Sequence, residues 1–460
     1  MQTKLLSISV LVSLLLLTAC ATFYEINYEF NQNFERGNIE QANTVLDKNK
    51  KRLNRKTSFL YQVNKGVVTG ILNDFETSNL HFEEAYLFGE DYSQNYLNLA
   101  ASFLVNPTLT EYKGEDHEHL LVLYYKALNY LKLNDYESAL VECRRLNNRL
   151  NALDDKYKSE NKYKRDAFIN NLMGIIYEAS GDFNNAFIAY RNAYNVYKED
   201  YAELFFVIAP DQLKLDLMRT AYLNGFNEEL DFYEKEFDQE YVHQPQANGE
   251  LVFLWHNGLG PVKDEWSVNF TIIDGGPGIV TFENSDMGFS FPFTYDYDDD
   301  DDSFHVTDLD FFRVAFPKYV ERSPTHERAR LTVGGQSKEL ELAQNVNNSA
   351  FQVLRQRMIR EFGQSLLRAA LKKATEQAVE SENEGLGLLV GIVNALTEKA
   401  DTRNWQTLPH SIYYTRLPLD AGNNQVNLTL QANGRSDQNV QFNFEGRKGK
   451  TVFHTYQTLY

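Results

Sequence analysis

Cys20 is the residue whose type and position most clearly allow chemistry, because its thiol closes a segment with the layout of a secretory signal. Lys4 supplies the charged start, the stretch Leu5–Leu17 is an apolar run, and Ala19 is a small residue at the cleavage position. The apolar run is too short to cross a bilayer as a stable helix. We therefore expect an export signal. An ordinary secretory signal that ends at a cysteine by chance is the alternative.

The stretch Leu17–Cys20 resembles the lipobox of bacterial lipoproteins. In that family a diacylglyceryl group is joined to the thiol, the signal is cut before the cysteine, and the new amine is acylated, as with palmitate. The resemblance implies a signal peptide at residues 1–19 and a lipid on Cys20, and two or more acyl chains anchor a protein stably. Ala21 and Thr22 stand where an Asp would favour the inner membrane, so the resemblance implies the outer membrane of a Gram-negative bacterium. Whether the body faces the periplasm or the cell surface stays open.

Two clusters further along the chain contain side chains of metal-binding type. His117 and His119 are two residues apart and point to different faces of a helix, unlike the four-residue spacing of helical zinc sites. We expect a polar loop before a helix there, and no metal. Asp298–Asp302 is a carboxylate run without the Gly and Glu of an EF-hand loop. A solvated acidic loop is the preferred interpretation, with loose Ca²⁺ binding as the alternative.

Composition favours an exported binding protein. The formal net charge of −19 repels nucleic acid, so no nucleic-acid partner is expected. Cys143 is the only other cysteine, which leaves no disulfide in the mature chain, and it should behave as a small buried apolar residue. The chain has no nucleophile elbow, phosphate loop or dinucleotide fingerprint. We therefore expect no catalytic residues, no cofactor and no enzymatic activity.

Helical repeats organise the N-terminal half. The clearest unit begins with a helix at Ala167–Tyr177, turns at Gly181 and Asp182, and continues in a second helix. This unit resembles a tetratricopeptide repeat (TPR), in which small residues let paired helices approach closely. The resemblance implies that the following small and aromatic residues pack within and between the hairpins: Gly66, Ala127, Tyr130, Ala139, Gly174, Tyr177, Ala186, Tyr190 and Ala193.

The same register recurs upstream, with unit starts near residues 23, 59 and 120. Only the first interval is close to the usual period of about 34 residues, so we expect an insertion around Asp91 to Asp116. Residues 211–237 continue helically and should cap the last repeat. Residues 20–240 are therefore expected to form an all-α solenoid with a concave binding surface, a generic array of helical hairpins being the alternative.

The pattern changes to strands at about residue 245. Short runs rich in aromatic and β-branched residues, separated by Gly, Pro and Asn, predict mainly antiparallel strands. These runs are Leu251–Trp255, Trp266–Ile273, Phe311–Phe316, Val426–Leu430, Val440–Phe444 and Thr451–Phe453. The connection Asn433–Asp437 predicts a hairpin of the fourth and fifth runs, to which the sixth adds a third strand.

A helical insertion at about 347–400 separates the two sets of strands. It contains the apolar element Leu386–Leu396, with glycines at 387 and 391. A helix buried against a sheet is the preferred interpretation of this element, and membrane insertion is the alternative. Residues 245–460 are thus expected to form an α+β domain with a helical insertion.

Two segments of this half look like the signature of a group of bacterial lipoproteins with tetratricopeptide-like N-terminal halves. They are Gly258–Glu265 and Thr397–Pro409, the second followed by Arg416–Leu419. The resemblance implies that the two halves belong together in the cell envelope, and it implies no activity. Arg403 and Trp405 could form an exposed recognition pair, because Trp and Arg often anchor interfaces. Seating of this loop against the core is the other interpretation.

Recognition is the function that these patterns favour. We expect a membrane-anchored lipoprotein that acts as a TPR-type adaptor in envelope assembly or regulation, with an envelope protein or peptide in the solenoid groove. The 28 tyrosines suit a groove that is apolar in body and hydrogen-bonding at its tips. The alternative is a surface lipoprotein that captures nutrients such as glycans, because some Gram-negative glycan-capture lipoproteins also combine a lipobox with helical repeats.

Overall fold

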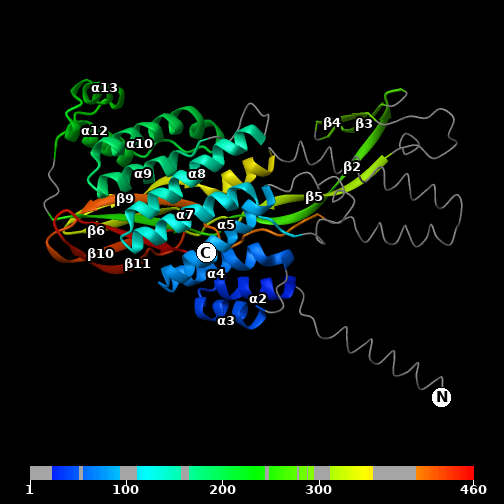
Figure 1. Cartoon of the computed structure of the whole chain (residues 1–460), viewed down its shortest axis with the longest axis horizontal. Coiled ribbons are helices and arrows are strands. Elements are labelled where there is room, and N and C mark those ends of the chain that lie inside the picture. The colour runs from blue at the N-terminus through cyan, green and yellow to red at the C-terminus, as the bar shows by residue number, and fades with distance from the viewer. Residues whose placement is uncertain are drawn as a thin grey trace, which may run out of the picture.

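The computed structural model describes residues 23–50, 55–93, 111–156, 165–243, 248–276, 279–286, 288–294, 311–355 and 400–459. Helices make up the first half, and strands follow from Glu250 onward (Figure 1). Cys20, Asp298–Asp302 and Leu386–Leu396 lie outside the described residues. Within the described ranges, no helix combines the length and the hydropathy that a membrane crossing needs.

Antiparallel helix pairs form the N-terminal array. The pairs are α2 (Phe23–Glu35) with α3 (Ile39–Asn49), α4 (Ser58–Ile71) with α5 (Phe75–Ser93), α7 (Asp116–Lys132) with α8 (Tyr136–Lys156), and α9 (Ala167–Ala179) with α10 (Phe183–Val196). Each pair turns through a residue with positive φ: Gly37, Asn73, Asn134 and Gly181. Glycine and asparagine adopt this left-handed conformation most readily, so the turns were visible in the sequence.

The repeat pattern changes after α10. A π-helical turn, η4 (Tyr197–Tyr201), and the short α11 (Ala202–Leu204) lead into an irregular loop at residues 205–210. The last pair, α12 (Asp211–Asn224) and α13 (Asn227–Phe237), then packs beside α10 and ends the array, as predicted for the capping pair.

Two four-stranded sheets pack face to face in the C-terminal half. The inner sheet has the order β12-β1-β9-β8, and the outer sheet has the order β11-β10-β6-β7. Their strands are β1 (Glu250–Asn257), β6 (Arg328–Val333), β7 (Gln336–Glu339), β8 (Glu341–Asn345), β9 (Ser411–Pro418), β10 (Gly422–Gln431), β11 (Gln438–Gly446) and β12 (Thr451–Gln457). The helical array covers the other face of the inner sheet (Figure 1).

Strand β1 shows why the inner sheet holds the molecule together. Leu251, Phe253 and Trp255 pack into the core between the two sheets. Val252 and Leu254, which point the other way, join the core of the helical array. A strand buried on both faces appears in the sequence as a continuous apolar run rather than as an alternating one.

The predicted hairpin is confirmed, but its third strand is not. In the pairing of β10 with β11, Val426 lies opposite Phe442 and Leu428 opposite Val440. β12, however, crosses to the inner sheet and pairs in parallel with β1. The reason is that Phe453 of β12 packs into the helical core, where its ring lies 6.0 Å from that of Tyr136.

A third sheet extends away from the body as an arm (Figure 1). Its order is β4-β3-β2-β5, with bounds β2 (Val262–Asp274), β3 (Ile279–Asn284), β4 (Phe289–Thr294) and β5 (Phe311–Val320). The helical insertion begins at residues 346–355, which are helical. Its continuation at 356–399 lies outside the described residues.

Candidate functional site

The inner face of the helical array, where we expected a partner peptide, is filled by the chain itself. Every residue of α7 from Asp116 to Asn129 is buried, although a helix at an open groove would expose one side. The hydroxyl of Tyr124 is 2.9 Å from Nε2 of His256 on β1. Lys132 donates to the carbonyl of Phe453 at 3.0 Å. The expectation of an open groove was therefore wrong, because the inner sheet occupies that face.

The segment Ala400–His410, which we call the inner segment, fills the same face beside α4, α5 and α7. The backbone N–H of Trp405 donates to Oε1 of Glu118 at 2.6 Å. The Trp405 ring lies 5.7 Å from that of Tyr125 and 6.0 Å from that of Phe82. Thr407 donates to the side chain of Asn64 at 3.1 Å. This irregular segment thus lies along the helices in the manner expected of a bound peptide.

Arg403 and Trp405 are therefore not an exposed recognition pair. Their side chains are buried, and Trp405 is only 1% exposed. Arg403 donates to the carbonyl of Lys56 at 3.0 Å and pairs with Asp401 at 2.6 Å. The two side chains hold their own loop against the core, which was the other interpretation of these residues.

A buried polar cluster surrounds Glu118 at the start of α7. Its carboxylate accepts hydrogen bonds from the Tyr112 hydroxyl at 2.8 Å and from the backbone N–H of Glu115 at 2.9 Å, besides that of Trp405. Lys263 on β2 pairs with Glu115. Burial raises the pKa of Glu118 to about 7, against the opposing effects of Lys263 and the Trp405 N–H. One lysine therefore serves two buried carboxyl groups.

We expected a polar loop at Asp116–His119, and that prediction was wrong. The run forms the first turn of α7 and is buried. Burial lowers the pKa of His117 to about 3, which keeps its imidazole neutral. No group of three or more His, Cys, Asp or Glu side chains in the described part of the chain is placed to hold a metal ion.

A second buried cluster joins α9 and α12 to the inner sheet through Arg416 of β9. Its guanidinium lies 2.7 Å from Glu178, 3.1 Å from Asp216 and 2.5 Å from Glu250. Arg219 adds bonds to Glu178 and Asp216, each at 2.7 Å. Burial disfavours the charge on Glu178, but Arg219 and Arg416 outweigh it and hold its pKa well below the usual range. Two arginines thus form ion pairs with three carboxylates in this cluster.

The residues assigned to repeat packing lie between the helices. A Cβ atom on Gly66 would lie 2.7 Å from the Phe82 ring, and one on Gly174 would lie 2.4 Å from that of Tyr190. These contacts show why glycine stands where the two helices of each hairpin approach. The remaining members are Ala127, Ala139, Ala186, Ala193 and Tyr190, which are fully buried, and Tyr130 and Tyr177, which are partly buried against the same core.

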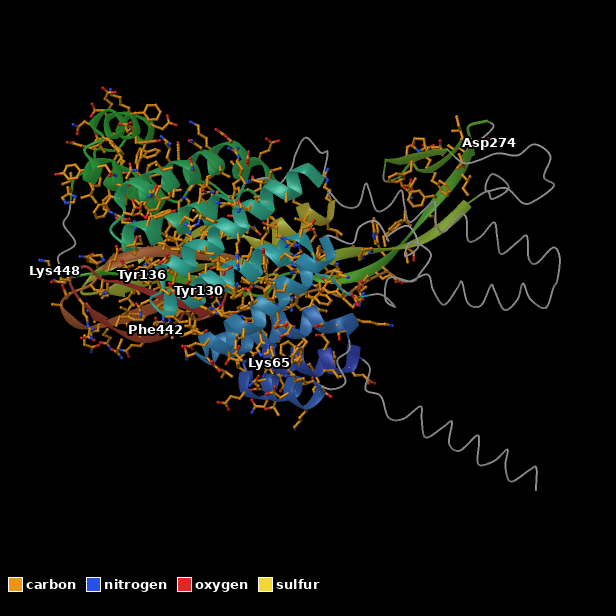
Figure 2. All side chains as sticks on the ribbon, viewed as in Figure 1. Lys65, Tyr130, Tyr136, Asp274, Phe442 and Lys448 are labelled. Carbon is orange, nitrogen blue, oxygen red and sulfur yellow. The ribbon has the colours of Figure 1, made fainter. Side chains whose placement is uncertain are left out.

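Tyr130 and Tyr136 lie beside the β-sandwich rather than on an open surface (Figure 2). Cys143 is buried and free, and burial raises the pKa of its thiol to about 12. This matches the expectation of a small apolar residue in the core.

Apolar side chains stand exposed on the loop that follows the π-helical turn. Phe206 is 81% exposed and Ile208 is 75% exposed, whereas Phe205 and Val207, which precede them, are buried. Phe206 has a φ of 57°, a conformation that is strained for a bulky side chain. Asn348, in the helical stretch 346–355, donates to the Phe205 carbonyl at 3.0 Å and holds the start of the loop. We call residues 205–210 the apolar loop.

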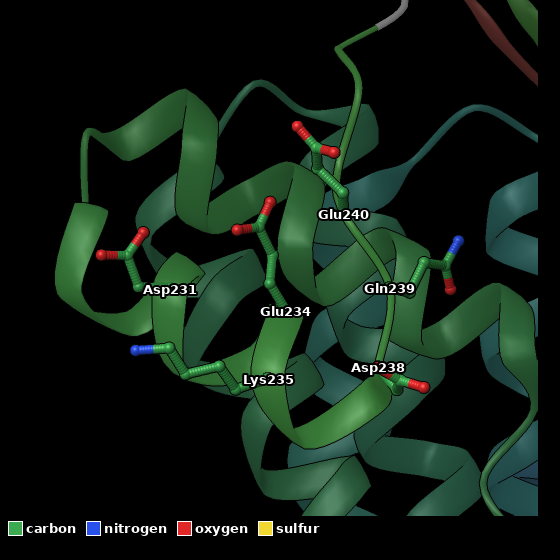
Figure 3. A pocket seen from close by; sticks show the side chains of 6 residues that line it. All are labelled: Asp231, Glu234, Lys235, Asp238, Gln239 and Glu240. Atoms are coloured by element: carbon green, nitrogen blue, oxygen red, sulfur yellow. The ribbon is translucent and has the colours of Figure 1, made fainter.

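A shallow acidic groove of about 520 Å³ lies at the end of the array, on α13 and the residues after it. Its lining residues are Asp231, Glu234, Lys235, Asp238, Gln239 and Glu240. Their side chains spread outward instead of converging on one point (Figure 3). Glu234 already accepts a hydrogen bond from the Tyr241 N–H at 2.8 Å. The groove resembles the polar outer face of a capping pair.

The sequence had offered only faint signals for these features. Arg416 is a lone charge inside the strand run Ser411–Pro418, and the apolar loop is an uncharged run between helices. A charge in such a strand is costly to bury without partners, which is a reason to look for a cluster around it. Two of its partners, Glu178 and Tyr190, come from helices 238 and 226 residues away in the chain.

No protein-family model and no curated protein sequence matches the chain. Solved structures of TPR-like repeat proteins resemble its N-terminal half. A crystal structure of MamA shares 10% identity over 47% of this chain and 94% of that chain, with a TM-score of 0.29. A kinesin light chain with TPR-like repeats from Podosopora anserina shares 12% identity over 46% of this chain and 90% of that chain, with a TM-score of 0.30.

The Rap conjugation regulator of plasmid pLS20, solved in complex with the Phr* peptide, shares 16% identity over 47% of this chain and 54% of that chain. Its TM-score is 0.28. Likenesses of this size carry no argument about function. The hairpin array of the present chain is established by its own helices.

Proposed function

We propose that the protein works by binding: it is a lipid-anchored adaptor of the cell envelope that meets an envelope protein through the outside of its helical array. Cys20 carries the lipid in this proposal, which rests on the lipobox resemblance of Leu17–Cys20. The inner face is closed by the inner sheet and the inner segment. A partner must therefore bind elsewhere on the surface.

The apolar loop is the observation that carries the proposal. Two large apolar side chains, Phe206 and Ile208, are held in water at a strained backbone, and neither contributes to the core. Strain of this kind persists only where the surrounding structure enforces it, and it is concentrated at functional positions. Aromatic and aliphatic side chains on a fixed loop suit an apolar pocket of a partner protein.

Site-specific photo-crosslinking in intact cells tests the proposal. A benzophenone amino acid replaces Phe206 in one variant and Tyr28, which is 66% exposed on α2, in the control. We expect one discrete protein adduct from position 206 and none from position 28. Adducts with lipid alone at position 206, or no adduct at all, would contradict the adaptor function.

The anchor requires its own test, because it is independent of the loop. Cells are labelled with an alkyne analogue of palmitate, and the protein is compared with a Cys20→Ser variant. We expect label and membrane association in the parent chain and loss of both in the variant. Label that persists in the variant would place the lipid elsewhere.

A further inference from the structure

The outer face of the outer sheet carries amide side chains that the fold does not use. Gln425 and Asn427 on β10 and Gln441 and Asn443 on β11 are all exposed. The alternate positions on the same strands point inward, so that Val426 and Leu428 are buried and Phe442 packs against Phe253. Phe442 marks the position of this sheet, on the side of the sandwich away from the helices (Figure 2). We call the four residues the amide grid.

The register makes the grid a regular array. Asn427 lies directly opposite Gln441, and Gln425 directly opposite Asn443. Cross-strand neighbours are about 5 Å apart, and positions two along a strand are about 7 Å apart. None of the four side chains makes a hydrogen bond within the described part of the chain, although each amide can donate two hydrogen bonds and accept others.

The composition of these two strands conflicts with local preference. Five of the ten residues in GNNQVNLTLQ and four of the nine in QNVQFNFEG are Asn or Gln. Asparagine is depleted in strands, where Thr, Val and aromatic residues are preferred. Where a sequence departs from local propensity without a gain in packing, a functional role is the expected reason.

The absence of charge on the amide grid indicates what kind of ligand it can bind. The whole chain has a formal net charge of −19, yet the grid is uncharged. The nearest charges on the face are paired: Arg330 with Glu339 at 2.9 Å, and Glu445 with Arg447 at 2.6 Å. A neutral ligand that both donates and accepts hydrogen bonds at closely spaced positions fits this surface. Hydroxyl groups on neighbouring carbons of a sugar do both.

We propose that the amide grid is a binding surface for a neutral polysaccharide. The sheet face presents two adjacent rows of amides, and each row can take the hydroxyl groups of one stretch of the polymer. The site uses no residue of the apolar loop and does not include Cys20, so its test is independent of both. A second copy of the chain pairing along the β11 edge is the competing occupant.

Affinity electrophoresis of the full chain tests this site. The protein, solubilised in a detergent without a sugar headgroup, is run in native gels that contain dextran, mannan, glycogen, laminarin or galactomannan. The test variant Asn427→Lys/Gln441→Glu introduces a cross-strand ion pair, which preserves the sheet while removing two amides. The matched control Asn227→Glu/Gln239→Lys also replaces one Asn and one Gln by one acidic and one basic residue, on exposed residues of α13 and its C-terminal flank.

We expect retardation of the parent chain and the control by at least one polysaccharide, with binding of the test variant weakened about fivefold or more. Absence of retardation in every gel would overturn the proposal. Equal retardation of the parent and test variant would do so too. Sedimentation velocity is run in parallel, and a dimer that the test variant abolishes would assign the face to a second copy of the chain instead.

Discussion

Two buried clusters join the helical array to the strands, and they differ in how they balance charge. Around Arg416, two arginines form ion pairs with three carboxylates, Glu178, Asp216 and Glu250. Around Glu118, one lysine serves two carboxyl groups, and backbone and hydroxyl donors supply the rest. The first cluster therefore keeps Glu178 ionised, whereas the second favours a protonated Glu118. The comparison teaches that one interface can contain a region that is weakened in acid and another that is weakened as the pH rises.

Removing the shared cation should break the first cluster. In Arg416→Met, three buried carboxylates lose their common partner, and we expect a loss of about 4 kcal/mol in the free energy of unfolding. Urea titration of the full chain measures it. Arg330→Met is the matched control, because its pair with Glu339 is exposed and should contribute less than about 1 kcal/mol. Equal losses in the two variants would mean that the Arg416 cluster is not a structural centre.

Trp405→Ala should be the next most damaging change, at about 3 kcal/mol. The substitution leaves a cavity beside the stacked rings of Phe82 and Tyr125 and removes the Nε1–H bond to Thr407 at 2.7 Å. Limited proteolysis should then cut within the inner segment, which the parent chain protects. A variant as stable and as resistant as the parent would show that this segment does not close the inner face.

Lys263→Met probes the second cluster directly. Glu115 loses its ion pair with Lys263 in this variant. Because a proton can neutralise a buried carboxyl group, the loss in the free energy of unfolding should depend on pH. We expect about 2 kcal/mol at pH 8 and less at pH 6. The same loss at both pH values would contradict the idea that this cluster adjusts by taking up a proton.

Glu118 and Glu178 should affect the pH dependence of stability in opposite directions. The pKa of Glu118 rises from 4.5 to about 7 on folding, so the native state binds the extra proton, and stability falls as pH rises through this window. Glu118→Gln should remove that fall, which amounts to roughly 1 kcal/mol or more. The pKa of Glu178 is lowered, so its contribution is present above pH 4.5 and is lost in acid. Thermal unfolding from pH 3 to 8 measures both, with Glu178→Gln as the counterpart.

The helical hairpins could be predicted because their determinants are local. Small residues at the close approaches, Gly or Asn at the turns and the helical period all lie within one repeat. The hairpin of β10 and β11 was predicted for the same reason: its alternation and its turn are adjacent in the sequence. Strands β3, β4 and β6 to β9 were missed. Arg328–Val333 in β6 illustrates the difficulty, because only three apolar residues alternate there with charged and polar ones.

The closed inner face could not be predicted, because it depends on contacts between distant parts of the chain. Trp405 meets Glu118 across 287 residues, and Arg416 meets Glu178 across 238. Nothing local distinguishes a Trp that anchors a partner from one that anchors its own chain. The parallel pairing of β12 with β1 has the same origin.

Native-state hydrogen exchange tests most directly that the array and the sandwich are one body. It is read by mass spectrometry on peptides from α9 and α12 and from β1 and β9, in the parent chain and in Arg416→Met. We expect the four elements to exchange through a common opening in the parent chain and to lose protection together in the variant. Loss of protection in the strands alone, with α9 and α12 unchanged, would contradict the account.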